Sequence, residues 1–330
     1  GNLYPFYKVD QSPLINYLLY DRVQFININL DNFEKLLDND LLPTNKLSLA
    51  SKYGLLEIVK YLINFANINL DLDDALIEAA DNGHLEVVKH LILKGANIRA
   101  DNDEAIKFAI EKGHLNIVKY LIESKNDYIN YKWILYQAIE NDHLDIVKYL
   151  VERGANIHIE NDKALQLASE NSSPDIVKYL ISNGANIHVA NDYPLRMAVK
   201  RRQLDLVSYL VDRGSLNNRV LLEASFYGYL EIVKYLVEHG ANIHAENDSA
   251  LKYAIQKGHL DVVKYLVSKG ANIHVDEDIA IVIASNSGHL DIVKYLVEQG
   301  SNIHTGDNYP LRIAQRRGHK DIVSYLQSLS

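Results

Sequence analysis

Histidine is the residue type whose number and spacing in this chain could support chemistry. The chain has 13 histidines, and imidazole serves both as a general base and as a metal ligand. Most of them form two series: His84, His114, His143, His259, His289 and His319 follow Gly or Asp, and His158, His188, His244, His274 and His304 follow Asn-Ile. Because members of a series recur once per repeat, they run parallel rather than converge on one ion. We therefore predict no metal site and expect turn histidines that bond to the backbone.

The sequence lacks the residues and motifs that other kinds of catalysis need. Cysteine is absent, which removes thiol nucleophiles, disulfides and thiolate metal sites and fits a reducing compartment. The sequence has no Gly-rich phosphate loop, no Gly-x-Ser-x-Gly elbow and no His-Glu-x-x-His motif. We predict that the protein is not an enzyme and uses no cofactor.

A recurring sequence motif contains the histidines of the first series. The run Gly258-His259-Leu260-Asp261-Val262-Val263-Lys264-Tyr265-Leu266 returns 30 residues later from Gly288, with Ile292 in place of Val262. Each copy predicts two short helices and a finger, with glycine at the helix ends and an aspartate as N-cap of the first helix, as at Asp162, Asp192, Asp248 and Asp278. Helices of roughly ten residues are unstable alone, so neighbouring copies must stack.

The unit of helix, Gly-His, helix and Gly-Ala-Asn-Ile finger resembles the ankyrin repeat over about residues 44–330. Its Ile-Val-Lys-Tyr-Leu version is similar to ankyrin proteins of giant viruses that infect amoebae. Two features depart from the family: Asp-x-Ala-Leu or Tyr-Pro-Leu-Arg replaces Thr-Pro-Leu-His, and the period is shorter than about 33 residues. The resemblance implies an all-α solenoid of paired short antiparallel helices with short β-turn fingers.

The domain organisation follows from counting second helices. Residues 1–43 are expected to form a capping segment, which we interpret as a degenerate repeat, and residues 44–330 to form ten repeats. The last repeat is expected to act as the C-terminal cap, and the spacing is irregular at 124–134 and 214–220. The second helices are expected to begin near Leu56, Leu85, Leu115, Leu144, Pro174, Leu204, Leu230, Leu260, Leu290 and Lys320.

Tyrosine is the other residue in excess, with 22 copies. Nine of them occupy one position of the second helix: Tyr61, Tyr120, Tyr149, Tyr179, Tyr209, Tyr235, Tyr265, Tyr295 and Tyr325. We expect a structural ladder with rings packed between repeats and hydroxyls toward water.

Charge and hydropathy limit the partners. The formal net charge of −9 repels nucleic acid and anionic membranes, so neither is expected to bind. No run approaches the about 18 apolar residues of a membrane span. A rival hypothesis keeps nucleic-acid binding open through Arg196, Lys200, Arg201, Arg202, Arg312, Arg316 and Arg317, although these form no continuous stripe.

The candidates for partner binding are residues that differ between repeats and are not needed for packing one repeat on the next. Alignment with the family places one set of them on the concave face, where Met and aromatic anchors beside Arg are typical of a protein-binding hot spot. The candidate binding residues are Phe108, Met197, Lys200, Arg201, Phe226, Tyr227, Tyr253, Lys257, Ile283 and Arg316. The alternative for each is that it only contacts adjacent helices.

These observations favour a non-catalytic protein-interaction module, expected to be monomeric, that binds a partner segment on its concave face. The viral resemblance implies a host protein as partner in the cytoplasm, with the nucleus also open. Two alternatives remain: the substrate-recruiting part of a ubiquitin ligase adaptor, and a structural or decoy array with no specific ligand.

Overall fold

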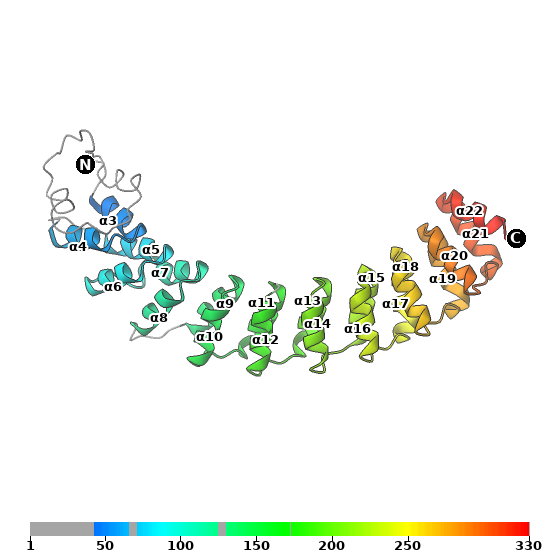
Figure 1. The fold of residues 1–330 in the computed structure, drawn as a ribbon, viewed down its shortest axis with the longest axis horizontal. Coiled ribbons are helices and arrows are strands. Elements are labelled where there is room, and N and C mark those ends of the chain that lie inside the picture. Colours follow the sequence, from blue (N-terminus) through cyan, green and yellow to red (C-terminus); the bar gives the residue numbers. More distant parts are fainter. Residues whose placement is uncertain (1–42, 66–70, 125–129, 172, 330) are drawn as a thin grey trace, which may run out of the picture. The chain divides into compact units, whose positions relative to one another are not determined.

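The chain forms short helices in antiparallel pairs (Figure 1). The computed structural model describes residues 43–65, 71–124, 130–171 and 173–329. The predicted capping segment, up to residue 42, and residues 125–129 of the irregular stretch lie outside this range. The chain divides into two compact units, Gly1–Asn156 and Ile157–Ser330.

In the first unit, four helix pairs are described. Their first helices are α3 (Pro43–Lys52), α5 (Leu72–Asp81), α7 (Ala100–Glu111) and α9 (Tyr131–Glu140). Their second helices are α4 (Leu56–Phe65), α6 (Leu85–Leu93), α8 (Leu115–Glu123) and α10 (Leu144–Glu152).

The second unit has six described pairs. Its first helices are α11 (Ile159–Glu170), α13 (Val189–Lys200), α15 (Asn218–Tyr227), α17 (Ala245–Lys257), α19 (Val275–Ser287) and α21 (Thr305–Arg317). Its second helices are α12 (Pro174–Ser182), α14 (Leu204–Val211), α16 (Leu230–Glu238), α18 (Leu260–Ser268), α20 (Leu290–Glu298) and α22 (Lys320–Gln327). The second helices of both units begin at the expected residues.

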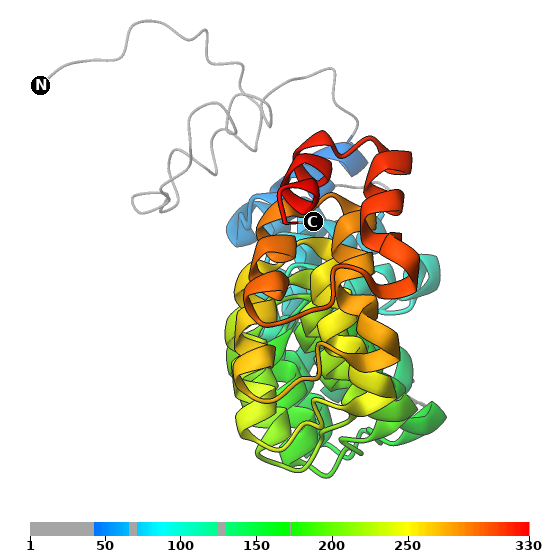
Figure 2. The ribbon, with the colours of Figure 1, turned by 90° about the vertical axis from the view of Figure 1, so that its right-hand side faces the viewer.

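Within each unit, first helices pack on first helices and second helices on second helices, so the unit has two layers (Figure 2). Small residues let the first helices approach closely, as Ala250 and Ala254 do in α17, where each is at most 1% exposed. The second helices bury an apolar stripe, such as Val262, Val263 and Leu266 of α18. No strand occurs among the described residues. The prediction of an all-α repeat solenoid of paired short helices is confirmed.

The turn between the two helices of a pair joins one repeat to the next. His289 Nε2 lies 3.2 Å from the Gln256 carbonyl oxygen, a repeat earlier. The same contact is made by His84, His114, His143, His259 and His319. The prediction that turn histidines bond to backbone is confirmed. Each ring also covers the turn glycine of the preceding repeat, where a Cβ would meet it at under 3 Å.

The fingers are short turns whose backbone differs from the prediction. In α17, Glu246, Asn247 and Asp248 have left-handed φ angles of 52°, 60° and 56°, a region that Asn and Asp tolerate better than most residues. The predicted N-caps Asp162, Asp192, Asp248 and Asp278 all lie in such triplets. Their carboxylates accept from the finger histidine four residues earlier instead. The N-cap prediction is therefore wrong for these four aspartates.

Helices that follow an irregular finger do begin with a side-chain cap. The Asn130 side chain accepts from the Trp133 amide before α9, and the Asn217 side chain accepts from the Val220 amide before α15. Such caps satisfy one of the free amides of the first turn. The shortened finger at 214–220 therefore fixes where α15 starts.

Candidate functional site

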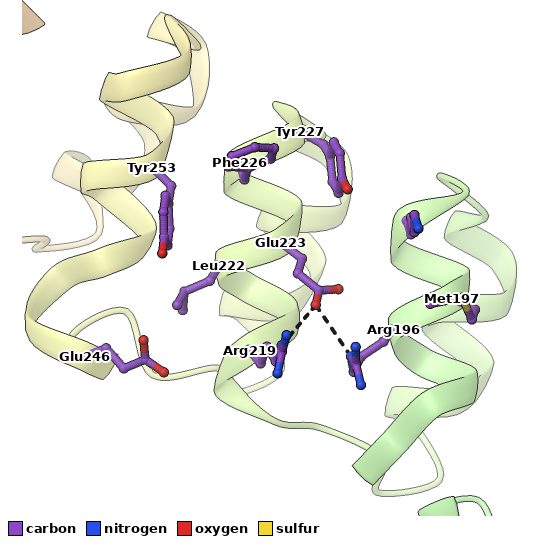
Figure 3. Close-up of a pocket in the computed structure, with 10 residues that line it drawn as sticks. Arg196, Met197, Arg219, Leu222, Glu223, Phe226, Tyr227, Glu246 and Tyr253 are labelled. Carbon is purple, nitrogen blue, oxygen red and sulfur yellow. Dashed lines mark hydrogen bonds and ion pairs between the residues drawn. The ribbon is translucent and has the colours of Figure 1, made fainter. Parts of the chain in front are cut away.

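A hollow of about 490 Å³ opens on the first-helix layer of the second unit (Figure 3). We call it the first-helix pocket. Its walls come from α13, α15 and α17, which contact one another in sequence. The lining residues are Arg196, Met197, Lys200, Arg219, Leu222, Glu223, Phe226, Tyr227, Glu246 and Tyr253.

Half of the predicted binding residues line this pocket: Met197, Lys200, Phe226, Tyr227 and Tyr253. Two more border it. Lys257 Nζ stands 4.4 Å from the centroid of the Phe226 ring, and Arg201 follows Lys200 and donates to the Glu170 carbonyl oxygen.

The other three predicted residues lie outside the pocket lining. Phe108 is on α7 in the first unit, where Lys107 Nζ lies 5.6 Å from its ring centroid. Ile283 is half-buried on α19, and Arg316 is exposed on α21.

An arginine pair shares one carboxylate at the pocket wall. Glu223 Oε1 lies 3.2 Å from Arg219 Nε and 3.5 Å from Arg196 Nε. The Arg196 and Glu223 side chains are only 22% and 24% exposed, so solvent screens this pair less than a surface pair. Two guanidinium groups meet one carboxylate here, which leaves positive charge available to an incoming anion.

Three aromatic rings form the apolar end of the pocket. The Phe226 ring packs edge-on against Tyr227 at 5.2 Å and against Tyr253 at 6.0 Å between centroids. Tyr227 and Tyr253 remain 39% and 38% exposed. Exposed aromatic rings held by neighbouring rings lose little side-chain entropy on binding, so they suit an apolar anchor of a partner.

The site also contains residues that the sequence interpretation did not select. Arg219, Leu222 and Glu246 line the pocket, but the alignment took only the residue before the helix alanine and the second and third residues after it, and these three stand at other positions. The spacing Arg219-x-x-x-Glu223 was a usable signal, since side chains four residues apart meet on a helix face.

The shortened finger holds α15 against α13. Asp192 Oδ1 accepts from the Ser215 hydroxyl at 2.8 Å, and Asp192 Oδ2 accepts from the Asn217 amide group at 2.9 Å. Burial acts to raise the pKa of Asp192, but hydrogen bonds from Asn217, His188 and Ser215 outweigh it and hold the pKa below its usual range. A buried carboxylate thus ties together the two helices that carry most of the pocket.

The tyrosine series packs between repeats, as predicted. Lys119, Lys178, Lys264 and Lys294 lie 5.3 to 5.7 Å from the ring centroids of the tyrosines one repeat later. Two of the hydroxyls differ from the prediction of exposure to water: Tyr209 donates to the Lys178 carbonyl oxygen at 3.1 Å, and Tyr265 to the Lys234 carbonyl oxygen at 3.4 Å.

The described residues form neither a metal-binding cluster nor a membrane-spanning helix. In the described ranges, no three His, Cys, Asp or Glu side chains come together as a metal-binding group. Each finger histidine from His158 to His274 has a carboxylate partner, and His304 has Asn308 in that place. None of the described helices combines the length and the apolar character needed to cross a bilayer.

Comparison with known proteins identifies the repeat. A model of three ankyrin copies matches residues 11–102, 47–133, 76–161, 135–220 and 195–277, and a model of many ankyrin copies matches residues 280–327. The chain is similar to alpha-latrotoxin-Lh1a of Latrodectus hasselti, with 30% identity over 89 residues. That match covers 26% of this chain and 7% of the length of the latrotoxin.

Proposed function

We propose, from the premise that the chain belongs to the ankyrin-repeat family, that it is a non-catalytic module that binds a segment of a partner protein in the first-helix pocket. Ankyrin repeats are protein-interaction modules. The observation that carries the proposal is the grouping of Met197, Phe226 and Tyr253 in one hollow that three cations and only two carboxylates also line. Aromatic anchors beside arginine are typical of the energetic centre of an interface.

The chemistry of the pocket defines the segment that fits it. The rings of Phe226, Tyr227 and Tyr253 suit one apolar or aromatic side chain of the partner. Arg196, Arg219 and Lys200 face only Glu223 and Glu246 among the lining residues, so carboxylates flanking that side chain gain charge-assisted hydrogen bonds. The ligand is therefore an acidic segment with an apolar anchor.

The wider setting of this proposal comes from the sequence resemblance. On that basis the partner is a host protein met in the cytoplasm, and the chain acts as a monomer with residues 44–330 as its recognition array. The overall charge of −9 counts against nucleic acid as the ligand.

A displayed library of random peptides, selected on the intact chain, tests the proposal. We expect enriched peptides to carry Asp or Glu around one apolar residue. The double substitution Phe226→Ala with Tyr253→Ala is expected to weaken these peptides by roughly 30-fold, or about 2 kcal/mol, as measured by calorimetry. Circular dichroism checks that the variant stays folded.

Tyr309→Ala is the matched control, because Tyr309 is as exposed as Tyr253, at 38%, but does not line the pocket. Its affinity for the selected peptides should equal that of the parent chain. Peptides that bind the pocket variant and the parent equally would refute the proposed function.

A further inference from the structure

The turn edge beside the first-helix pocket lacks the Gly-His contact that Gly228, Gly258 and Gly288 make with the next repeat. At Gly228, a Cβ would lie 2.4 Å from the ring of His259, the turn residue of the next repeat. One repeat earlier the equivalent pair is Arg202 and Tyr229, with the Arg202 guanidinium carbon 5.7 Å from the Tyr229 ring centroid. The turns before α12 and α14 also lack the histidine, with Ser173 and Gln203 in its place, but only the pair of Arg202 and Tyr229 puts a cation and an aromatic ring at this edge.

Aromatic contacts continue from the pocket to this edge. Tyr227, which lines the pocket, stacks on Tyr229 with 5.5 Å between centroids and an interplanar angle of 19°. Arg202 then covers Tyr229 from the other repeat. The chain of contacts Tyr227, Tyr229, Arg202 therefore leads out of the pocket and over the turn.

A second hollow lies where this chain of contacts ends. It measures about 430 Å³ and is formed by the N-terminal ends of α12 and α14, with Arg202, Gln203 and Leu204 in its wall. Lys178 also lines it, together with two aspartates, Asp175 and Asp205. We call it the turn-edge hollow.

The positive charge of residues 200–202 indicates which kind of partner segment suits this edge. Lys200, Arg201 and Arg202 are consecutive and exposed, and they lie between the two hollows in a chain whose net charge is −9. Three adjacent cations against the overall sign of the protein are complementary to an acidic stretch of a partner.

We propose that the surface for the acidic partner segment extends from the first-helix pocket, across Tyr227, Tyr229 and the cations of residues 200–202, into the turn-edge hollow. This inference rests on the proposed function and extends it. A partner segment that only fills the pocket leaves this edge uncovered, whereas one that continues over the edge places a second acidic group beside Arg202.

The test uses a variant that restores the repeat's own residues, Arg202→Gly with Tyr229→His. It removes the cation and the ring but supplies the pair found at Gly228 and His259, and Arg202 has a left-handed φ of 57° that glycine adopts more readily. Thermal unfolding should therefore show no loss of stability. The probes are displayed peptides of about 20 residues, able to reach roughly 65 Å when extended, and their truncations to about 10 residues that keep the pocket-binding part.

We expect the restored variant to bind the longer peptides at least about tenfold more weakly than the parent, which corresponds to about 1.4 kcal/mol. The truncated peptides should bind both proteins equally. Longer peptides that lose less than about twofold would overturn the extension, as would a labelled single-stranded RNA that binds the edge more tightly than any peptide at about 150 mM salt.

The pocket variant Phe226→Ala with Tyr253→Ala separates the two proposals. If it weakens every peptide while the restored variant weakens none, the extension fails and the pocket function stands. If it weakens none, the pocket function itself fails, whatever happens at the edge.

Discussion

Asp192 is the side chain on which the pocket walls depend most directly. It accepts hydrogen bonds from His188, Ser215 and Asn217 at 2.7 to 2.9 Å. The last two donors belong to the short finger that leads into α15, so loss of the acceptor would release α15 from α13. A buried acceptor whose donors remain costs roughly 1–3 kcal/mol when it is removed.

Folding stability should therefore depend on pH through Asp192. The folded pKa lies below the usual value, and the unfolded pKa is about 3.9. The ionised carboxylate contributes fully above about pH 4, and its contribution is lost as pH falls through the folded pKa. We expect Asp192→Asn to lower the urea midpoint at pH 7 and to differ less from the parent below about pH 4.

Asp307→Asn is the control for this titration, because its side chain is 88% exposed. The urea midpoint of Asp307→Asn should differ little from that of the parent at every pH. A gap between Asp192→Asn and the parent that stays constant from neutral to acid pH would contradict the role given to the carboxylate.

The hydroxyl of Tyr235 is a second group whose pKa depends on one neighbouring side chain. Its hydroxyl donates to Asp212 Oδ1 at 2.6 Å, and this bond, ahead of burial, raises the pKa of Tyr235 to about 12. Ionisation would place a phenolate beside a carboxylate. We expect Asp212→Asn to return the pKa toward the ordinary value of about 10, as followed by NMR of ¹³C-labelled tyrosine. A pKa that stays near 12 would exclude Asp212 as the cause.

At the scale of the element, the contact between turn histidine and turn glycine stabilises the stacking of helix pairs. A Cβ on Gly288 would lie 2.6 Å from the His319 ring, which is held by the Asn286 carbonyl oxygen at 3.2 Å. Gly318 has a similar φ, 80° against 83°, but meets nothing within 4 Å. We expect Gly288→Ala to cost about 1–2 kcal/mol more than Gly318→Ala in urea unfolding.

The His319→Ala background separates contact from backbone strain. Without the His319 ring, Gly288→Ala should lower the free energy of unfolding only as much as Gly318→Ala does. The remaining loss then comes from the left-handed backbone alone, because the ring contact and the backbone strain act through different atoms. An unchanged cost in that background would show that the ring is not the obstacle.

Sequence reasoning located the helices well because their starts carry a fixed signal. Every second helix begins one residue after the turn position, whether that residue is Leu260, Pro174 or Lys320. The left-handed triplets were missed because an aspartate such as Asp248 has the same preference for an N-cap as for that backbone region. Local preference does not distinguish the two, whereas the contact with His244 does.

The pocket was predicted in part for a related reason. Three positions per repeat, counted from the alanine of each first helix, gave Met197, Phe226 and Tyr253, which line one pocket. The same rule also gave Ile283, which lies apart, because a pocket needs large side chains on three successive helices. Arg219 was not selected, because it stands five residues before Ala224, a position that the rule takes in no repeat.

At the scale of the molecule, the contacts between turns are unevenly distributed within the second unit. The Gly-His contact joins the turns at Gly228 and His259, Gly258 and His289, and Gly288 and His319. It is replaced at Arg202 and Tyr229, next to the pocket. In a repeat array, stability is close to a sum of neighbour interfaces, so the weakest interface opens first.

Native-state hydrogen exchange should reveal this difference. We expect amides of α14 to exchange faster than those of α18, although both helices lie inside the stack, since the turn before α14 lacks the Gly-His contact. Arg202→Gly with Tyr229→His should slow exchange in α14 and α16 and leave α20 unchanged, because repeats contact only their neighbours. Equal protection of α14 and α18 in the parent chain would contradict this account, and so would a restored variant that slows every helix alike, since the gain would then not be local to the turn at residue 202.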